Sequence, residues 1–195
     1  MTTVVIAEDE AIIRLDLRET LIDEGYDVIG ETGRGDEAVE LVRNLHPDLV
    51  ILDIKMPGID GLQAARLITE DRLAAVLILT AFSQRDLIVQ ARDAGALAYL
   101  VKPFQRSDLV PAIEVALGRF AEMRALQEQS TDLEERLAAR KVLDRAKGVL
   151  MDECAMGEQA GFRFIQTTAM SERTTMKAVA ERIIAGELRP EETTP

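Results

Sequence analysis

Acidic residues and one lysine follow several apolar runs of the chain, at the positions where strands are expected to end. Asp53 ends the apolar run of residues 49–52 and precedes a loop rich in proline and glycine. Glu8 and Asp9 follow a second run, and Lys102 follows a third. In open α/β sheets, ligands bind at this edge of the strands. Mg²⁺ prefers carboxylate oxygens, waters and phosphate oxygens, so these acids suit a Mg²⁺ site that could also hold a phosphoryl group.

The same residues predict phosphoryl chemistry at Asp53. Like charges about 4 Å apart repel by roughly 4 kcal/mol at an effective dielectric near 20, and a divalent cation would remove that cost. A carboxylate can act as a nucleophile and form an aspartyl phosphate. The Lys102 ammonium would then face one phosphate oxygen, and the Thr80 hydroxyl, after the apolar run of residues 75–79, would donate to another.

Alternating patterns predict the elements that position these groups. Apolar runs suited to buried strands alternate with segments that have apolar residues at helical spacing. This alternation predicts a parallel sheet with helices on both faces. Neighbouring first and third strands would bring Glu8, Asp9 and Asp53 together, as in the flavodoxin-like order 2-1-3-4-5 of a (βα)5 fold. The expected strands are residues 4–7, 26–31, 49–52, 75–79 and 97–101.

Four motifs in this order resemble the receiver domain of two-component response regulators, over residues 1–120. They are VVIAEDE, LDIKMPGIDG, LILTA and YLVKPF. The resemblance implies that a sensor histidine kinase phosphorylates Asp53. It also implies that Glu8, Asp9, Asp53 and the backbone carbonyl of Lys55 hold Mg²⁺.

The receiver resemblance implies a switch as well. Thr80 would move toward the phosphoryl group, Tyr99 would swing inward behind it, and the peptide bond between Lys102 and Pro103 would be cis. Only slow loss of the phosphoryl group is expected of such a protein, which acts as a regulator.

Composition favours an intracellular protein. The chain has 195 residues, of which 47% are hydrophobic and 30% charged. No apolar run approaches the roughly 18 residues that span a bilayer, and the N-terminus leads directly into a strand, so neither a membrane partner nor a secretory signal is expected. Cys154 is the single cysteine, which excludes an intrachain disulfide. We therefore expect the cytoplasm, and we expect a surface role for the single histidine, His46.

The negative charge is concentrated in the first two thirds of the chain. Residues 1–130 hold 13 basic and 23 acidic residues, a net charge of −10, whereas residues 131–189 hold ten of each. The overall charge of −12 excludes strong non-specific binding to nucleic acid by the whole molecule. The neutral C-terminal part could still carry one basic face.

A helical linker is expected at residues 121–132. An amphipathic helix should begin at Ser107 as N-cap and run on without a stop signal. The sequence leaves open one long helix or two with a kink near Ser130, where Thr131 and Glu134 match a capping box. The heptads are imperfect and fit an ordinary helix as well as a dimer seam.

The last domain, residues 133–188, should be a small three-helix, all-α unit. Its helices are expected at residues 132–152, at 158–170 and after Thr174, which is expected to cap the third. Phe162 and Phe164 are expected in its core rather than as a stacking platform. Residues 189–195 should form a mobile tail.

Two segments resemble the ANTAR domain, an RNA-binding antitermination module, over roughly residues 133–186. They are LDRAKGVLMDE and GFRFIQTTAMSERTTMKAVAERII. Joined to a receiver, the domain implies a phosphorylation-dependent regulator that binds twin RNA hairpins in nascent transcripts, as a dimer, and prevents termination. Basic residues on its helices are the RNA-contact candidates. These are Lys147, Arg173 and Lys177, followed by Arg145 and Arg163.

Two other functions fit parts of the sequence. The helices at 158–170 and 174–184 imitate a helix-turn-helix, which would make the protein a DNA-binding regulator, but the second helix offers only Lys177 and Arg182 as cations. A phosphatase of the haloacid-dehalogenase type would also use a strand-end aspartate. It needs a second acid two residues later, where this chain has Lys55.

Overall fold

The structure, a computed structural model, describes residues 1–81 and 85–190. The chain divides into two compact units, Met1–Ala125 and Leu126–Pro195. Helix α5 (Arg106–Cys154) belongs to both, and each unit is described separately below. No helix among the described residues is both long enough and apolar enough to cross a membrane.

The first unit contains a five-stranded parallel sheet in the order β2-β1-β3-β4-β5. This order confirms the predicted flavodoxin-like fold. All residues of β3 and β4 are buried, as expected for central strands that are covered on both faces. The strands are β1 (Thr3–Ala7), β2 (Asp27–Thr32), β3 (Leu49–Asp53), β4 (Ala75–Thr80) and β5 (Ala98–Val101).

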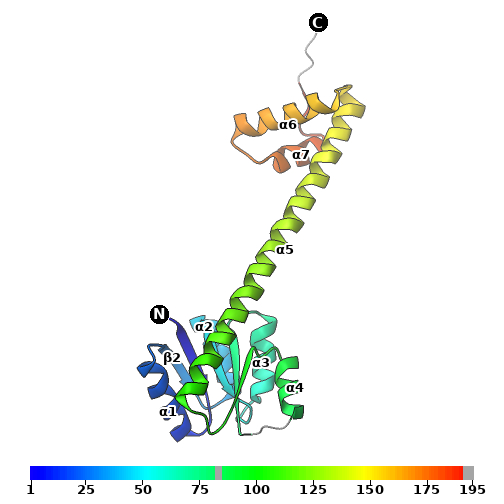
Figure 1. Ribbon diagram of the computed structural model, residues 1–195. Helices are drawn as coiled ribbons and strands as arrows, with labels where there is room; N and C mark the ends of the chain where they lie inside the picture. Colours follow the sequence, from blue (N-terminus) through cyan, green and yellow to red (C-terminus); the bar gives the residue numbers. More distant parts are fainter. Residues whose placement is uncertain (82–84, 191–195) are drawn as a thin grey trace. The chain divides into compact units, whose positions relative to one another are not determined.

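Helices cover both faces of the sheet (Figure 1), and an apolar layer holds them onto each face. Alternate strand residues point to opposite faces, so Val5 packs with one layer and Val4 with the other. The first layer joins α2 (Gly35–Leu45), α3 (Gly61–Glu70) and α4 (Arg85–Asp93) to the sheet. The second joins α1 (Ala11–Asp23) and the first turns of α5.

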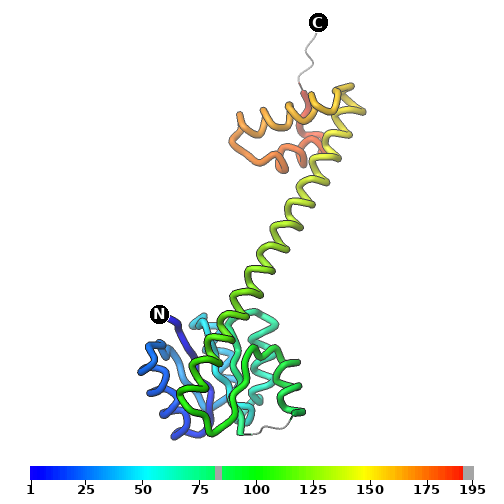
Figure 2. The backbone as a smooth tube through the Cα atoms, in the orientation of Figure 1, coloured from blue at the N-terminus to red at the C-terminus, as the bar shows by residue number. Residues whose placement is uncertain are grey.

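Helix α5 is continuous through Ser130, which settles the question that the sequence left open (Figure 2). The Thr131 hydroxyl donates to the carbonyl of Gln127 at 3.0 Å, a bond within the helix, so the predicted capping box is wrong. Good helix formers on both sides outweigh the local cap signal. Ser107 is not the N-cap either, because the helix begins one residue earlier, at Arg106.

The second unit packs α6 (Glu158–Glu172) and α7 (Met176–Ile184) against the end of α5. Its core holds Ala146, Leu150, Ile165, Ala169, Val179, Ala180 and Ile183. Thr175, and not Thr174, caps α7, because its hydroxyl accepts the Ala178 amide at 3.1 Å. Of the predicted tail, residues 191–195 lie outside the described part of the chain.

The two phenylalanines of α6 have different environments. Phe164 packs against the core of the second unit, as expected. Phe162 is 44% exposed, so its expected place in the core is wrong. Apolar spacing alone did not separate them, because the face that α6 buries is set by how it meets α5 and α7.

Candidate functional site

Three carboxylates gather at the carboxyl edge of the sheet. Each of Glu8, Asp9 and Asp53 offers an oxygen, and these oxygens lie within 4.8 Å of one another. They meet because β1 pairs directly with β3, so the residues after both strands share one edge. Glu8 and Asp53 are only 1% and 6% exposed, whereas Asp9 is exposed. Two buried acids and one accessible acid thus face the same small space.

Lys102 supplies the positive charge at this edge. Its Nζ lies 2.5 Å from Glu8 Oε2 and 3.2 Å from Asp53 Oδ1. The backbone positions it: the Lys102 amide donates to the Thr80 carbonyl at 2.7 Å, and the Lys102–Pro103 peptide bond is cis, as the receiver resemblance implied. Lys102 therefore links the ends of β1 and β3 through one ammonium.

Burial and charge shift the pKa values of these groups. Burial raises the pKa of Glu8 and of Asp53, and Lys102 offsets part of each increase. Burial alone would lower the pKa of Lys102, but the two carboxylates outweigh it and raise the pKa above its usual value. Lys102 is thus held in its charged form. The three carboxylates outnumber this one ammonium, so a further cation would stabilise their charged forms.

A close backbone approach fixes the position of Asp53. A Cβ on Gly61, the first residue of α3, would lie 1.9 Å from the Asp53 carbonyl oxygen. The Gly61 amide donates to the carbonyl of Ile54 at 2.9 Å, and the Asp60 side chain caps the helix by accepting from Gln63. Glycine is therefore needed here, because any side chain would separate α3 from the strand that ends in the acid.

Thr80 and Tyr99 lie on the neighbouring strands β4 and β5. Thr80 is fully buried and is the last residue of β4. A side-chain hydrogen bond joins it to Tyr99, which is half-buried against the apolar layer beneath. Burial raises the pKa of Tyr99, so its hydroxyl stays protonated at neutral pH. The structure thus brings the two predicted switch residues into contact.

A cavity of about 300 Å³ opens over the acids. Lys55 lines it two residues after Asp53, and Thr80 and Lys102 line it as well. The buried Glu8 Oε2 has no hydrogen-bond partner of regular geometry among the described residues, and the Lys102 ammonium lies 2.5 Å from it as an ion pair. Three converging carboxylates with such an oxygen are a donor set that suits a hard, oxygen-seeking cation such as Mg²⁺.

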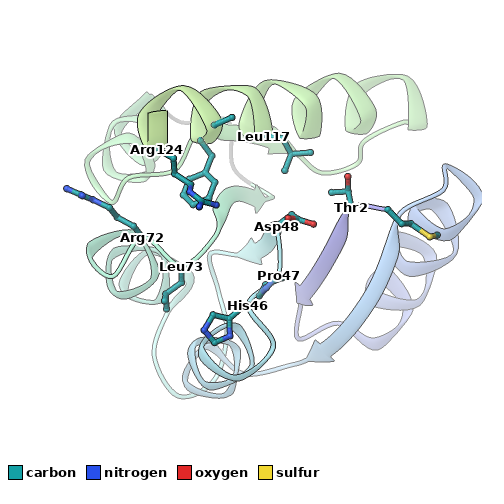
Figure 3. A pocket seen from close by; sticks show the side chains of 11 residues that line it. Thr2, His46, Pro47, Asp48, Arg72, Leu73, Leu117 and Arg124 are labelled. Atoms are coloured by element: carbon teal, nitrogen blue, oxygen red, sulfur yellow. The ribbon is translucent and has the colours of Figure 1, made fainter. Parts of the chain in front are cut away.

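A larger cavity, of about 710 Å³, lies at the opposite edge of the sheet (Figure 3). His46, Asp48 and Arg72 line it, and it contains none of the predicted site residues. His46 is exposed at the C-terminus of α2, as the sequence predicted. The Asp48 carboxylate accepts from the amide and the hydroxyl of Thr3, which ties the start of β3 to β1.

The five predicted RNA-contact residues lie in the second unit with different surroundings. Lys147 Nζ lies 2.8 Å from Asp144 and 2.9 Å from Glu158, so two carboxylates already bind it. Lys177 lies 4.0 Å from Glu181. Within the described part of the chain, the remaining three guanidinium groups form no ion pair; they belong to Arg145, Arg163 and Arg173.

A parallel sheet of this order, with buried acids, a lysine and a threonine at its carboxyl edge, defines a receiver domain. Residues 4–114 match the response regulator receiver domain family, and residues 131–184 match the ANTAR domain family. The chain therefore belongs to the response regulators that carry an ANTAR domain.

Individual relatives agree with this assignment. The chain is 56% identical to the transcriptional regulatory protein PdtaR of Mycobacterium tuberculosis over 181 residues, which are 93% of this chain and 88% of PdtaR. It is 39% identical to the chemotaxis protein CheY of Thermotoga maritima over 111 residues, 56% of this chain and 92% of that protein. Its fold is similar to a CheX–CheY–BeF3–Mg²⁺ complex from Borrelia burgdorferi, with a TM-score of 0.55, 30% identity, and coverage of 57% and 86%.

The two domains define the function at the level of the family. A receiver joined to an ANTAR domain makes the protein a phosphorylation-dependent transcription antiterminator, with a histidine kinase upstream and RNA as the ligand of the output domain. The DNA-binding alternative is wrong, because the ANTAR domain binds RNA. The matching families make the protein a regulator, which is the function they support in place of the phosphatase alternative.

Proposed function

We propose that Asp53 is the phosphoacceptor and that Glu8, Asp9, Asp53 and the backbone carbonyl of Lys55 hold Mg²⁺. The observation that supports this most strongly is the ammonium of Lys102, which lies within 3.2 Å of two buried carboxylates. Bound Mg²⁺ supplies positive charge to the oxygens of the incoming phosphoryl group. The Borrelia burgdorferi complex, which contains BeF3 and Mg²⁺, supports the choice of metal.

In the proposed reaction, a carboxylate oxygen of Asp53 attacks the phosphorus of a phosphohistidine on the kinase. The new O–P bond forms as the P–N bond breaks, and the ring nitrogen leaves with the electron pair. Lys102 then exchanges a carboxylate contact for a phosphoryl oxygen, and the Thr80 hydroxyl donates to another. Tyr99 follows Thr80, because the two side chains are hydrogen-bonded. Only slow hydrolysis of the aspartyl phosphate is expected.

For the output, we propose that the domain at residues 133–188 binds twin hairpins in nascent transcripts. Arg145, Arg163 and Arg173 are the contacts with the least competition from neighbouring acids. Lys147 and Lys177 would first have to release their carboxylate partners. Nascent RNA as the ligand also makes the cytoplasm the expected location.

We further propose that phosphorylation promotes a homodimer through the linker at residues 121–132 and the turns beside it. Residues 123, 126, 130, 133 and 137 of α5 follow the three-and-four spacing of a coiled-coil seam. Four of these five are large apolar side chains that are 46% to 66% exposed: Met123, Leu126, Leu133 and Leu137. Ser130 is the polar exception, and it explains why the heptads look imperfect in the sequence.

Sedimentation velocity with and without beryllium fluoride and Mg²⁺ tests the proposal, together with binding to a twin-hairpin RNA. Wild type should change from monomer to dimer and bind RNA more tightly, whereas Asp53→Ala should do neither. Equal RNA binding in all samples would show that Asp53 does not control the output. Equal sedimentation with increased RNA binding would refute only the dimer.

A further inference from the structure

A cavity of about 530 Å³ lies beside α6, on the part of the second unit that the RNA proposal concerns. Its volume is in the range of small-molecule sites. One wall comes from α5 and the rest from α6. The α6 cavity is lined by Lys147, Glu158, Gln159, Phe162, Arg163 and Gln166.

An exposed aromatic ring distinguishes this cavity. Phe162 is 44% exposed, although Gly161 and Ile165 on the same helix are buried. Single exposed apolar residues are common and carry little information by themselves. Here the ring borders a hollow whose other lining side chains are all polar or charged. A flat apolar surface surrounded by hydrogen-bonding groups suits a ligand that has the same two properties.

The spacing on α6 places these groups on one helix face. Gln159, Phe162, Arg163 and Gln166 stand at i, i+3, i+4 and i+7, so they are neighbours on the helix surface. Each glutamine amide offers two donor hydrogens and one acceptor oxygen. The Arg163 guanidinium forms no ion pair within the described residues. The face therefore presents a ring between two amides, with a free cation next to it.

Proteins recognise unpaired RNA bases with these groups. An unpaired base is stacked on an aromatic side chain, hydrogen-bonded along its edge and held by cations at its phosphate. Moreover, Lys147 and Arg163, which were chosen as RNA contacts from charge alone, line the cavity.

We propose that the α6 cavity receives one unpaired base from the loop of the RNA. The base stacks on Phe162, Gln159 and Gln166 hydrogen-bond to its edge, and Arg163 contacts the adjacent phosphate. Lys147 joins that contact only when Asp144 and Glu158 release it. The inference rests on the proposed binding of RNA hairpins and identifies the residue that reads the loop.

Binding of a labelled twin-hairpin RNA to the full chain tests this at fixed salt concentration. The RNA is selected on the wild type from a library with randomised loops. Stacking is worth about 1–3 kcal/mol per base, so Phe162→Leu should weaken binding about 5- to 150-fold at 1.4 kcal/mol per tenfold. Phe162→Tyr keeps the ring and should bind like wild type. Met151→Ala is the matched control, because Met151 is 45% exposed and lies outside the cavity.

A fluorescence measurement separates stacking from a loss of folding. The chain has no tryptophan, so Phe162→Trp introduces a single reporter. Its emission should be quenched by the hairpin RNA and not by an RNA duplex of the same stem without loops. A tryptophan introduced as Met151→Trp should respond to neither.

The outcomes are distinguishable. Failure of wild type to bind any RNA would overturn the hairpin proposal and this inference with it. If wild type binds and Phe162→Leu binds equally well, only the inference fails. If Phe162→Leu changes sedimentation but not RNA affinity, the ring is part of a protein interface and the base-binding assignment is wrong.

Discussion

Replacement of Gly61 by alanine should separate α3 from the phosphoacceptor. The new Cβ would lie 1.9 Å from the Asp53 carbonyl oxygen and 2.8 Å from its carbonyl carbon. Ordinary contact begins near 3.4 Å, so the atoms must move apart by about 1.5 Å. Both obstructing atoms belong to the backbone of β3 and cannot rotate away. The helix must therefore retreat, and the amide bond from Gly61 to Ile54, now 2.9 Å long, must lengthen.

The expected loss of stability is about 2–4 kcal/mol. Overpacking of a buried contact costs about 1–3 kcal/mol, and a weakened buried hydrogen bond adds about 1 kcal/mol. The acid should be displaced as well. A misplacement near 1 Å can slow a positioned reaction by about 100-fold. We therefore expect both a lower unfolding midpoint and much slower phosphorylation of Asp53.

Urea unfolding followed by tyrosine fluorescence measures the stability of the first unit, which contains Gly61. The only two tyrosines, Tyr26 and Tyr99, lie in the first unit, and the chain has no tryptophan. Phosphorylation by a small-molecule phosphodonor gives the rate. Gly118→Ala is the control, because its Cβ would meet nothing within 4 Å. Alanine inside α5 should raise the free energy of unfolding by about 0.5–1 kcal/mol. Wild-type stability and phosphorylation rate in Gly61→Ala would refute the reasoning.

Further predictions concern the buried charges and Tyr26. Lys102→Met should destabilise the metal-free first unit by about 3–5 kcal/mol, because it leaves Glu8 and Asp53 without a counter-charge. Saturating Mg²⁺ should restore part of this in urea titrations, and a midpoint that ignores Mg²⁺ would contradict the metal assignment. Burial raises the pKa of both acids above their ordinary values of 4.5 and 3.8. Their contribution to stability is therefore fully present below those values and is lost as the pH rises through the pKa of the folded state. The free energy of unfolding of the wild type, measured without metal, should fall over this pH range, and Mg²⁺ should make the fall smaller. Burial, followed by a hydrogen bond to Glu114, raises the pKa of Tyr26 from 10.0 to about 12, so its contribution should be lost as the pH rises through that interval. Tyr26→Phe removes the 3.0 Å bond to Glu114 and should cost about 1 kcal/mol at neutral pH. It should also remove the contribution of Tyr26 to the tyrosinate absorbance at high pH and leave that of Tyr99; an unchanged titration would count against it.

The sequence was sufficient for the receiver fold and for the geometry at its edge. Buried parallel strands have short continuous apolar runs in the sequence. The helices between them have apolar residues at a spacing of three and four, so the two kinds of element are easily distinguished. Residues that follow neighbouring strands must meet at one edge, whatever the details of packing. The flavodoxin-like order makes the first and third strands neighbours, so Glu8, Asp9 and Asp53 were expected together, and the structure has their oxygens within 4.8 Å.

Local signals were weaker at helix ends. Thr131 and Glu134 have the spacing of a capping box, yet Thr131 lies inside α5 and donates to Gln127. Thr174 and Thr175 are chemically equivalent caps in the sequence, and the structure uses Thr175. A cap is worth about 1 kcal/mol, which the propensity of a long run of good helix formers can outweigh.

Only the tertiary structure decided which groups remain available for a partner. Phe162 and Phe164 have the same apolar character, but α6 meets α5 and α7 in a way that packs Phe164 against the core and leaves Phe162 exposed. Lys147 was one of the three leading basic candidates by sequence, with Arg173 and Lys177, and the fold gives it two carboxylate partners. The sequence determines which chemistry the chain carries, because residue types and periods are local. The exposure and pairing of each side chain depend on contacts between distant segments, which exist only in the folded protein.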